Sequence, residues 1–148
     1  MLAPVVLIKA IVPHMIEQGG GTVINITSGA GYSEPPAPAG QGGWGLGYGA
    51  SKAALHRIAG ILALETAGDG IRAFNVQPGF IVTERMIQDM GAFGFDASSG
   101  APPAVIGKVC VWLLESPDAD ALNGQNIEAQ DVCEELGLLP GWTRTAYG

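Results

Sequence analysis

Cysteine and histidine are scarce in this chain, which limits the chemistry available to it. The 148 residues include two cysteines, Cys110 and Cys133, and two histidines, His14 and His56. Two cysteines cannot build a disulfide framework, and none of the four side chains has a partner at metal-ligand spacing. The sequence therefore predicts reduced thiols, a cytoplasmic protein, no bound metal, and histidines that pack in the fold or face solvent.

Basic charge and long hydrophobic runs are also lacking. Lys and Arg number 7 against 14 Asp and Glu, so the formal net charge is -7. A negative field repels nucleic acid and anionic membrane surfaces. The apolar opening "MLAPVVLIKAIVPHM" contains Lys9 and is too short to span a bilayer, so it indicates a buried amphipathic helix rather than a signal or anchor. We expect small-molecule or protein partners, without nucleic acid or membrane.

Apolar residues, in contrast, make up 47% of the chain, which is typical of a compact globular domain. Segments with helical spacing alternate with short β-branched runs bounded by glycine and proline, and this alternation indicates an α/β fold with a parallel sheet. The expected helices cover residues 4–18, 47–67 and 102–115, and the expected strands cover residues 21–27, 70–79 and 124–129, followed by a short tail.

Two irregular stretches are candidates for functional loops. Residues 28–47 form a connection too long for a turn in a compact domain. Residues 91–103 hold two phenylalanines among small residues and follow two methionines, so they indicate either an apolar lid or a plain surface loop. The glycines between residues 42 and 49 are interpreted as a flexible entry into a helix, and the Walker pattern fails because Lys52 follows Ser51 rather than a glycine.

Tyr48 and Lys52 stand one helical turn apart, at the start of an expected helix. A free phenol has a pKa of about 10, so it accepts a proton at neutral pH only where a nearby positive charge favours the phenolate. Lys52, at i+4, can supply that charge, although such a pair is as often a surface accident. Ser28 strengthens the case, because it follows a strand at the sheet edge where ligand crevices form.

Three segments together carry a family resemblance. The stretches "GGTVINITSGAG", "YGASKAALHRIAGILALE" and "GIRAFNVQPGFIVT" resemble the carboxyl-terminal two-thirds of a short-chain dehydrogenase/reductase, over residues 1 to about 115. The resemblance implies an incomplete doubly wound, Rossmann-like parallel sheet of about three strands with flanking helices, and NAD or NADP as cofactor. It implies that Ser28 positions the substrate oxygen, that Tyr48 exchanges the proton, and that Lys52 lowers the tyrosine pKa and binds the nicotinamide ribose together with Tyr48.

The strand exit "PGFIVT" also matches the family, in which this loop wraps the nicotinamide. The resemblance therefore adds four residues to the expected cofactor site: Pro78, Gly79, Ile81 and Thr83. A proline and a glycine that leave a strand end expose main-chain groups, and a threonine hydroxyl adds a hydrogen bond. Outside this context, Pro-Gly usually means no more than a tight turn.

The chain departs from the family pattern in three ways. The gap between Ser28 and Tyr48 is several residues longer than usual, the match thins after residue 115, and Met1 falls after the family's glycine-rich phosphate loop, its first four strands and its catalytic asparagine. We therefore expect residues 1–148 to form a single partial Rossmann-like domain, and the isolated chain to be inactive as a dehydrogenase.

Two functions remain open at this point. The first is an NAD(P)-dependent oxidoreductase that interconverts a secondary alcohol and a ketone; an apolar substrate is expected from the aromatic and methionine side chains of the two loops, which are Trp44, Met86, Met90, Phe93 and Phe95. The alternative is a non-catalytic truncated remnant that forms homo-oligomers through helices 4–18 and 47–67. Small residues at Ala50, Ala53, Ala54 and Ala59 would allow close helix approach, although helix-on-sheet packing explains them more simply.

Overall fold

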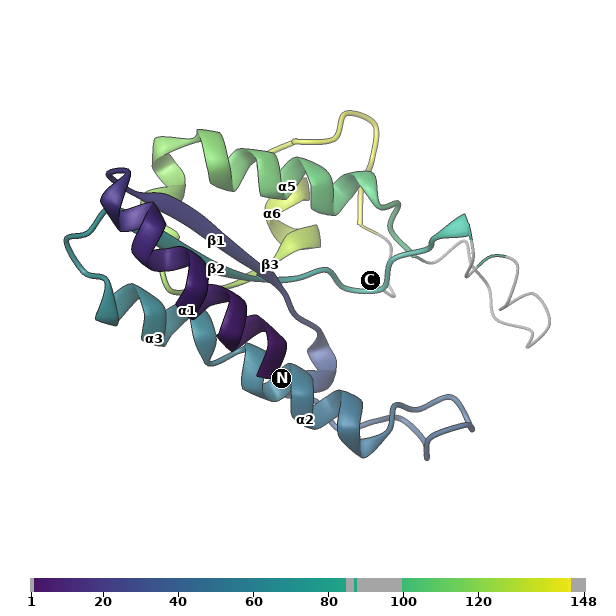
Figure 1. The fold of residues 1–148 in the computed structure, drawn as a ribbon. Coiled ribbons are helices and arrows are strands. Elements are labelled where there is room, and N and C mark those ends of the chain that lie inside the picture. Colours follow the sequence, from purple (N-terminus) through teal and green to yellow (C-terminus); the bar gives the residue numbers. More distant parts are fainter. Residues whose placement is uncertain (1, 85–86, 88–99, 145–148) are drawn as a thin grey trace. The chain divides into compact units, whose positions relative to one another are not determined.

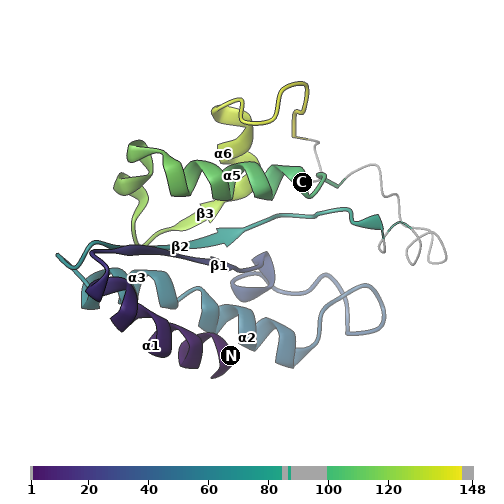
Figure 2. The same cartoon turned by 45° about the horizontal axis from the view of Figure 1, so that its top comes forward.

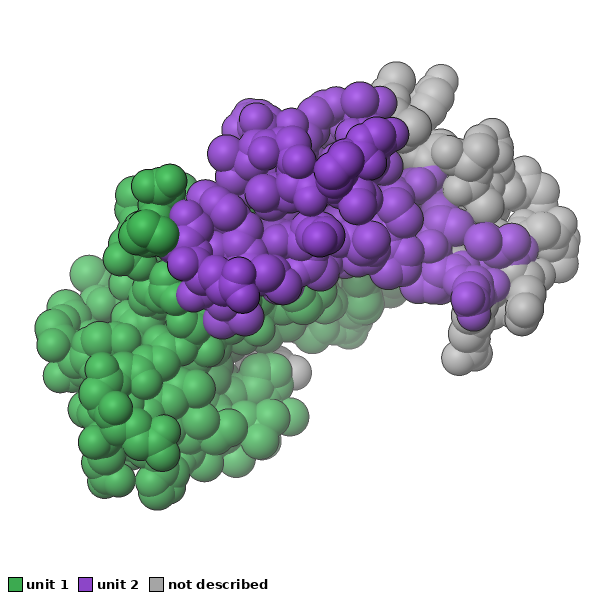
Figure 3. All heavy atoms as spheres, turned by 90° about the horizontal axis from the view of Figure 1, so that it is seen from above, with its two compact units in different colours: residues 1–77, 117–127 green, residues 78–116, 128–148 purple. Residues whose placement is uncertain are grey.

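A computed structural model describes residues 2–84, 87 and 100–144. The chain forms two compact units, which Figure 3 shows in different colours. The first unit comprises residues 1–77 and 117–127, and the second comprises residues 78–116 and 128–148. The expectation of one domain over residues 1–148 stays a prediction.

The sheet has three parallel strands. Strands β1 (Gly21–Ile26), β2 (Ile71–Gln77) and β3 (Asn126–Glu128) lie in the order β1-β2-β3. Strands β1 and β2 run parallel with Gly21 opposite Ile71 and Ile26 opposite Val76. Parallel strands need a crossover between them, and the helical segment between β1 and β2 supplies it. The predicted α/β class and three-stranded parallel sheet are confirmed.

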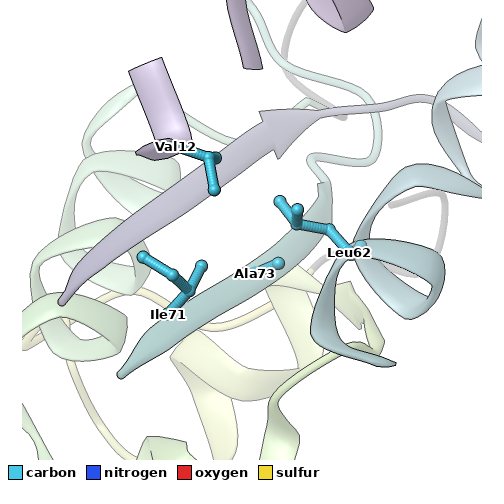
Figure 4. Close-up of a cluster of buried hydrophobic side chains, with 5 residues drawn as sticks. Val12, Leu62, Ile71 and Ala73 are labelled. Atoms are coloured by element: carbon cyan, nitrogen blue, oxygen red, sulfur yellow. The ribbon is translucent and has the colours of Figure 1, made fainter. Parts of the chain in front are cut away.

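Helices α1 (Leu2–Glu17) and α3 (Ile58–Glu65) lie side by side on one face of β1 and β2 (Figures 1 and 2). Val12 of α1 and Leu62 of α3 meet Ile71 and Ala73 of β2 in a buried cluster (Figure 4). Each fully buried Val, Leu or Ile side chain stabilises the fold by about 1.5–3 kcal/mol relative to exposure. Ala59 is completely buried in the same cluster, so the helix-on-sheet interpretation of this alanine is confirmed.

The expected helix over residues 47–67 is two helices, α2 (Leu46–Leu55) and α3, separated by a turn at His56 and Arg57. The carbonyl of His56 accepts a hydrogen bond of 3.0 Å from Nδ2 of Asn75, a side chain of the neighbouring strand β2. The N–H of Arg57 donates to the carbonyl of Ala54, three residues back, which tightens the last turn of α2. A tertiary contact therefore interrupts a segment whose local sequence favours one continuous helix.

Two glycines set the spacing of the turns that precede β1 and β2. A Cβ atom on Gly20 would lie 2.5 Å from the carbonyl oxygen of Gly70, and Gly20 itself has a φ of +137°. Gly70 has a φ of +73°, and its carbonyl accepts a hydrogen bond of 3.1 Å from the N–H of Gly21. Only glycine allows this close backbone approach, which starts the β1–β2 ladder in register.

The second unit contains helices α5 (Ala104–Glu115) and α6 (Ala129–Glu135), which pack against each other. Val105, Val109 and Leu113 form a fully buried stripe on α5, four residues apart. Helix α5 confirms the expected helix over residues 102–115. The expected short tail was wrong, because residues 129–135 form α6; this helix is only two turns long, too short for a helical period to stand out.

Two 3-10 helices complete the described elements, η1 (Gly29–Gly31) and η3 (Pro117–Leu122). Neither was predicted, since each is shorter than the window over which a periodic pattern can be recognised. Within the described residues, none of the helices combines the length and apolar character that crossing a bilayer requires.

Candidate active site

Helix α2 presents Tyr48 and Lys52 on one face, as their spacing predicted. Tyr48 is 48% exposed, and the Lys52 ammonium lies 5.7 Å from the centroid of its ring. Because residues four apart are neighbours on a helix, the first turns of α2 are enough to bring the phenol and the ammonium together. The exposed side chain of Tyr48 leaves its ring accessible to a ligand.

A second contact fixes the Lys52 side chain. Its Nζ donates a hydrogen bond of 3.0 Å to the main-chain carbonyl of Ile26, the last residue of β1. An ammonium group carries three N–H donors, and this bond uses one of them. Lys52 is therefore anchored at the carboxyl end of β1 and keeps further donors for another partner.

Ser28 follows β1 and begins the 3-10 helix η1. Its backbone is extended, with φ -167° and ψ 147°, and its Oγ accepts a hydrogen bond of 3.3 Å from the N–H of Ala30. A hydroxyl group that accepts in this way still has its own proton to donate. The hydroxyl of the half-buried Ser28 therefore keeps its own proton available for donation.

His56 caps the carboxyl end of α2, one helical turn after Lys52. Its Nε2 lies 2.9 Å from the main-chain oxygen of Ser28, and its Nδ1 lies 3.1 Å from Oδ1 of Asn126. The Tyr32 ring meets the imidazole edge-on, with centroids 5.0 Å apart. The sequence predicted only that His56 packs in the fold or faces solvent, because these contacts depend on residues far away in the sequence.

Three asparagines continue the polar network behind His56. Asn75 donates from Nδ2 to Oδ1 of Asn126 at 2.8 Å, and its own Oδ1 accepts from Nδ2 of Asn25 at 3.1 Å. Asn75 is fully buried, and Asn25 is almost so. Buried amides need such partners to offset their desolvation. None of these three asparagines was predicted as part of a site, since an asparagine in a strand is not by itself a functional signal.

A pocket of the first unit lies beside these residues rather than around them. A pocket of about 480 Å³ is lined by residues 30–35 and by Trp44 and several small residues of α2. Ser28, Tyr48 and Lys52 are not among its lining residues. The pocket therefore belongs to the long loop after β1, and Trp44 lines it.

The long loop also contains glycines at the G-x-G-x-x-G spacing, at Gly40, Gly42 and Gly45. In a dinucleotide-binding fold this pattern directly follows a strand and opens a helix. Here β1 ends at Ile26, well before Gly40, and the loop between them is irregular. The interpretation of these glycines as a flexible entry into α2 therefore agrees with the backbone.

The other four predicted cofactor residues lie in the second unit, whereas Ser28, Tyr48 and Lys52 lie in the first. Pro78 and Gly79 form the turn after β2, and Gly79 has a φ of +71°, a conformation that favours glycine. Ile81 pairs with Ala101 in an isolated parallel bridge, and Thr83 is exposed.

Gln130, which was not predicted as a site residue, holds this turn. Its Nε2 donates to the carbonyls of Pro78, at 3.1 Å, and Phe80, at 3.3 Å. The side chain is buried on α6, and a Cβ atom on Gly79 would lie 2.2 Å from the same Nε2. Four further residues expected to line the substrate site, Met86, Met90, Phe93 and Phe95, lie outside the described residues.

Both cysteines lie in the second unit, and their titration is shifted in the same direction. Burial raises the pKa of the Cys110 thiol above its ordinary value. Burial also raises the pKa of the Cys133 thiol, and a hydrogen bond with the backbone of Leu139 partly opposes this rise. Both thiols therefore resist ionisation, which is the opposite of what a nucleophilic cysteine needs.

Comparison with known proteins identifies the family. The family profile described as short chain dehydrogenase matches residues 1–90 of this chain. The chain belongs to the short-chain dehydrogenase/reductase family, as the resemblance of its three segments indicated.

Individual relatives agree with this assignment. The chain is 33% identical over 129 residues to the 7alpha-hydroxysteroid dehydrogenase of Paraclostridium sordellii, a match that covers 82% of this chain and 46% of that protein. It is 28% identical over 149 residues to a short chain dehydrogenase of Pseudocercospora fijiensis, with 90% of this chain and 46% of that protein covered. The chain thus spans about half the length of these two curated relatives.

Solved structures show the same fold. The structure of 4-hydroxyisoleucine dehydrogenase complexed with NADH superposes with a TM-score of 0.66 at 26% identity, covering 86% of this chain and 53% of that one. A protein of Thermus thermophilus superposes with a TM-score of 0.67 at 28% identity, covering 82% and 52%.

Proposed function

We propose that this chain carries the catalytic side chains of an NAD- or NADP-dependent oxidoreductase that interconverts a secondary alcohol and a ketone. The observation that carries the proposal is the placement of the Lys52 ammonium, 5.7 Å from the Tyr48 ring centroid and 3.0 Å from the Ile26 carbonyl. A fixed cation beside a phenol stabilises the phenolate that proton transfer leaves behind. Tyr48 gives its proton to the ketone oxygen in reduction and takes it back in oxidation.

Ser28 orients the substrate in this scheme. Its Oγ accepts from the N–H of Ala30 and keeps its own proton, which it can donate to the substrate oxygen. A preorganised donor of this kind stabilises the negative charge that develops on a carbonyl oxygen during reduction. Ser28 therefore binds and polarises the substrate oxygen, and it does not act as a nucleophile.

The donor set of the chain suits a nicotinamide cofactor, which supplies or accepts a hydride when bound. Lys52 has N–H donors left for ribose hydroxyls after its bond to Ile26. Pro78, Gly79, Ile81 and Thr83 would contact the carboxamide end through main-chain and hydroxyl groups. Gln130 supports this role, since it holds the turn by the carbonyls of Pro78 and Phe80.

We propose a small apolar alcohol or ketone as substrate. One relative is named for the oxidation of a hydroxysteroid, an apolar secondary alcohol. The side chains expected around the substrate are aromatic or methionine, and few charges accompany them.

The test measures oxidation of NADH and NADPH by the natural gene product that carries these residues, with hydrophobic cyclic ketones and charged keto acids in parallel. Turnover of the cyclic ketones that Tyr48→Phe abolishes is the expected result. Turnover that survives this substitution would overturn the assignment, and preference for keto acids would overturn the substrate class. The 148 residues by themselves are expected to turn over little, because they span about half of the relatives.

A groove between α1 and α3 favours a second activity, assembly with another copy. This groove, of about 250 Å³, is lined mainly by apolar side chains: Val5, Ile8, Lys9, Ile58, Ile61, Leu62 and Glu65. Leu64, on the same helix α3, is 81% exposed. Exposed apolar surface of this kind marks an interaction site. We propose that the protein forms homo-oligomers through these two helices.

A further inference from the structure

We propose that His56 is a positioning residue for Ser28: its Nε2 donates a hydrogen bond to the Ser28 main-chain oxygen, while its Nδ1 donates to Oδ1 of Asn126. The catalytic part of this inference rests on the proposed role of Ser28. The hydrogen-bonding part stands on the geometry of the polar network and can be tested separately.

The orientation of the network starts from an atom with a fixed role. The main-chain oxygen of His56 can only accept, and the Asn75 side-chain atom 3.0 Å from it is therefore the amide nitrogen. The same nitrogen lies 2.8 Å from a side-chain atom of Asn126, which must accept in turn and is therefore the oxygen. This choice agrees with Asn25, whose Nδ2 donates to the remaining oxygen of Asn75 at 3.1 Å. Assignments of amide oxygen and nitrogen always depend on such a network.

The ring of His56 therefore faces an acceptor on each side. Its Nε2 lies 2.9 Å from the main-chain oxygen of Ser28, and its Nδ1 lies 3.1 Å from the oxygen of Asn126. A neutral imidazole has one N–H and one lone pair, so it would place a lone pair against an oxygen. Only the imidazolium, with two N–H groups, satisfies both contacts. Its titratable neighbours include Lys52, one turn earlier on α2, and Tyr32, whose ring meets it edge-on.

A second observation shows that the Ser28 turn is built around this ring. A Cβ atom on Gly31 would lie 2.5 Å from Cδ2 of His56 and 2.9 Å from the nitrogen of Ala53. The absence of a side chain at Gly31 lets η1 lie directly on α2. His56 thus contacts both sides of the Ser28 turn, through the Ser28 carbonyl and through Gly31.

For catalysis, the contact of His56 with the Ser28 turn matters because it fixes where the Ser28 hydroxyl lies. Ser28 Oγ accepts a hydrogen bond from the N–H of Ala30, and His56 ties the turn that carries both residues to the end of α2 through the Ser28 carbonyl. Tyr48 lies on α2, about two turns before His56, the residue that caps the carboxyl end of this helix. His56 therefore ties the position of the serine to that of the tyrosine, and a small displacement of either lowers the rate.

The first experiment observes the ring directly. Nitrogen-15 NMR of the natural gene product at neutral pH should show two protonated ring nitrogens for the histidine whose signals disappear in His56→Gln. His14→Gln is the matched control and should leave these signals in place. A single protonated ring nitrogen at His56 would overturn the proposed double donation.

Two substitutions at Asn126 sharpen this test. Asn126→Asp keeps an acceptor beside Nδ1, so both ring protons should remain, whereas Asn126→Leu removes the acceptor and should release one. Loss of the Nδ1 proton in Asn126→Asp would contradict the proposed donation from Nδ1. The carbonyl carbon-13 shift of Ser28 should move in His56→Gln and stay unchanged in His14→Gln; an unmoved shift would contradict the anchoring of Ser28.

A double-mutant cycle tests the catalytic part. His56→Gln should lower kcat about tenfold, because it removes the hydrogen bond that positions Ser28. The KM for the cofactor should stay unchanged. In the Ser28→Ala background the same substitution should lower kcat almost no further, because the hydroxyl that His56 positions is absent. An equal loss in both backgrounds would show a general structural role. Wild-type turnover in Ser28→Ala and Tyr48→Phe would instead refute the proposed function, and the NMR result would still decide the hydrogen bonds.

Discussion

Lys52 and Ile26 are joined by a hydrogen bond of 3.0 Å that ties helix α2 to the last residue of strand β1. The two residues are far apart in the sequence, and the long loop between Ser28 and Tyr48 does not by itself fix the position of α2 at the end of the strand. His56 adds a second tie, 2.9 Å from the carbonyl of Ser28. The exit of β1 is thus held at two main-chain oxygens by side chains one helical turn apart.

Tyr48→Phe should abolish nearly all turnover in the natural gene product and leave the fold intact. The substitution removes one hydroxyl from a side chain that is 48% exposed, so the free energy of unfolding should change by no more than about 0.5 kcal/mol. Steady-state kinetics and thermal unfolding measure the two effects. Tyr32→Phe removes a hydroxyl from another exposed tyrosine and should retain most turnover. Comparable losses in both variants would contradict the proton-transfer role of Tyr48.

Lys52→Ala should slow turnover and weaken cofactor binding together. The substitution removes the cation beside Tyr48 and the bond to Ile26, an exposed contact whose loss should lower stability by about 1 kcal/mol. Fluorescence titration with NADH and NADPH, combined with kinetics, tests both effects. Lys108→Ala, at an exposed lysine of α5, is the control for loss of charge. Unchanged cofactor affinity in Lys52→Ala would argue against its role at the ribose.

The spacing of residues in the sequence was sufficient to predict the pairing of Tyr48 with Lys52, because an i, i+4 pair needs only a helix. The sheet followed from the alternation of β-branched runs with helical segments. The contacts of His56 could not be predicted in this way, since they depend on Asn75 and Asn126 from two other strands.

The break between α2 and α3 also depends on a contact between elements and could not be predicted from local sequence. Residues 47–67 have continuous helical propensity, and the interruption depends on a bond from Asn75 to the His56 carbonyl. Gln130 lies in a helix too short to be recognised, although its contacts with Pro78 and Phe80 shape the predicted cofactor turn. Local patterns therefore predicted contacts made within one helix, such as that of Tyr48 with Lys52, and missed contacts between elements.

Gly79→Ala and Gly107→Ala should have opposite effects on stability. Gly79 has a φ of +71°, and an added Cβ would lie 2.2 Å from the Gln130 amide, so the substitution should destabilise by about 1–3 kcal/mol. Gly107 lies inside α5 with no atom within 4 Å of an added Cβ, so alanine there should stabilise by about 0.5–1 kcal/mol. Chemical denaturation of both variants measures the difference. Equal effects would show that the turn tolerates a side chain.

The second unit should lose stability at alkaline pH. Burial raises the pKa of the Cys133 and Cys110 thiols in the folded state, so the unfolded chain releases these protons at lower pH than the folded one. The contribution of the two protonated thiols to the free energy of unfolding is complete below the ordinary thiol pKa. It is lost as the pH rises through the higher pKa of the folded state. Denaturation midpoints between pH 7 and pH 10 should fall less in Cys133→Ala than in the parent. An identical fall in both would contradict the linkage.

Glutamate in place of Ile61 or Leu64 should dissociate an oligomer that forms through α1 and α3. These side chains of α3 are 44% and 81% exposed, so a charge at either position can stay solvated in the monomer and should leave it folded. In an assembled interface the same charge would be desolvated, which costs several kcal/mol when it has no partner. Sedimentation equilibrium over a range of concentrations should therefore show a self-association that either substitution weakens at least tenfold. Val111→Glu changes a valine of similar exposure, 48%, on α5 and should leave the association unchanged. If Val111→Glu dissociates the protein and the α3 variants do not, a different surface makes the interface; if the parent stays monomeric at every concentration, the proposed assembly is wrong.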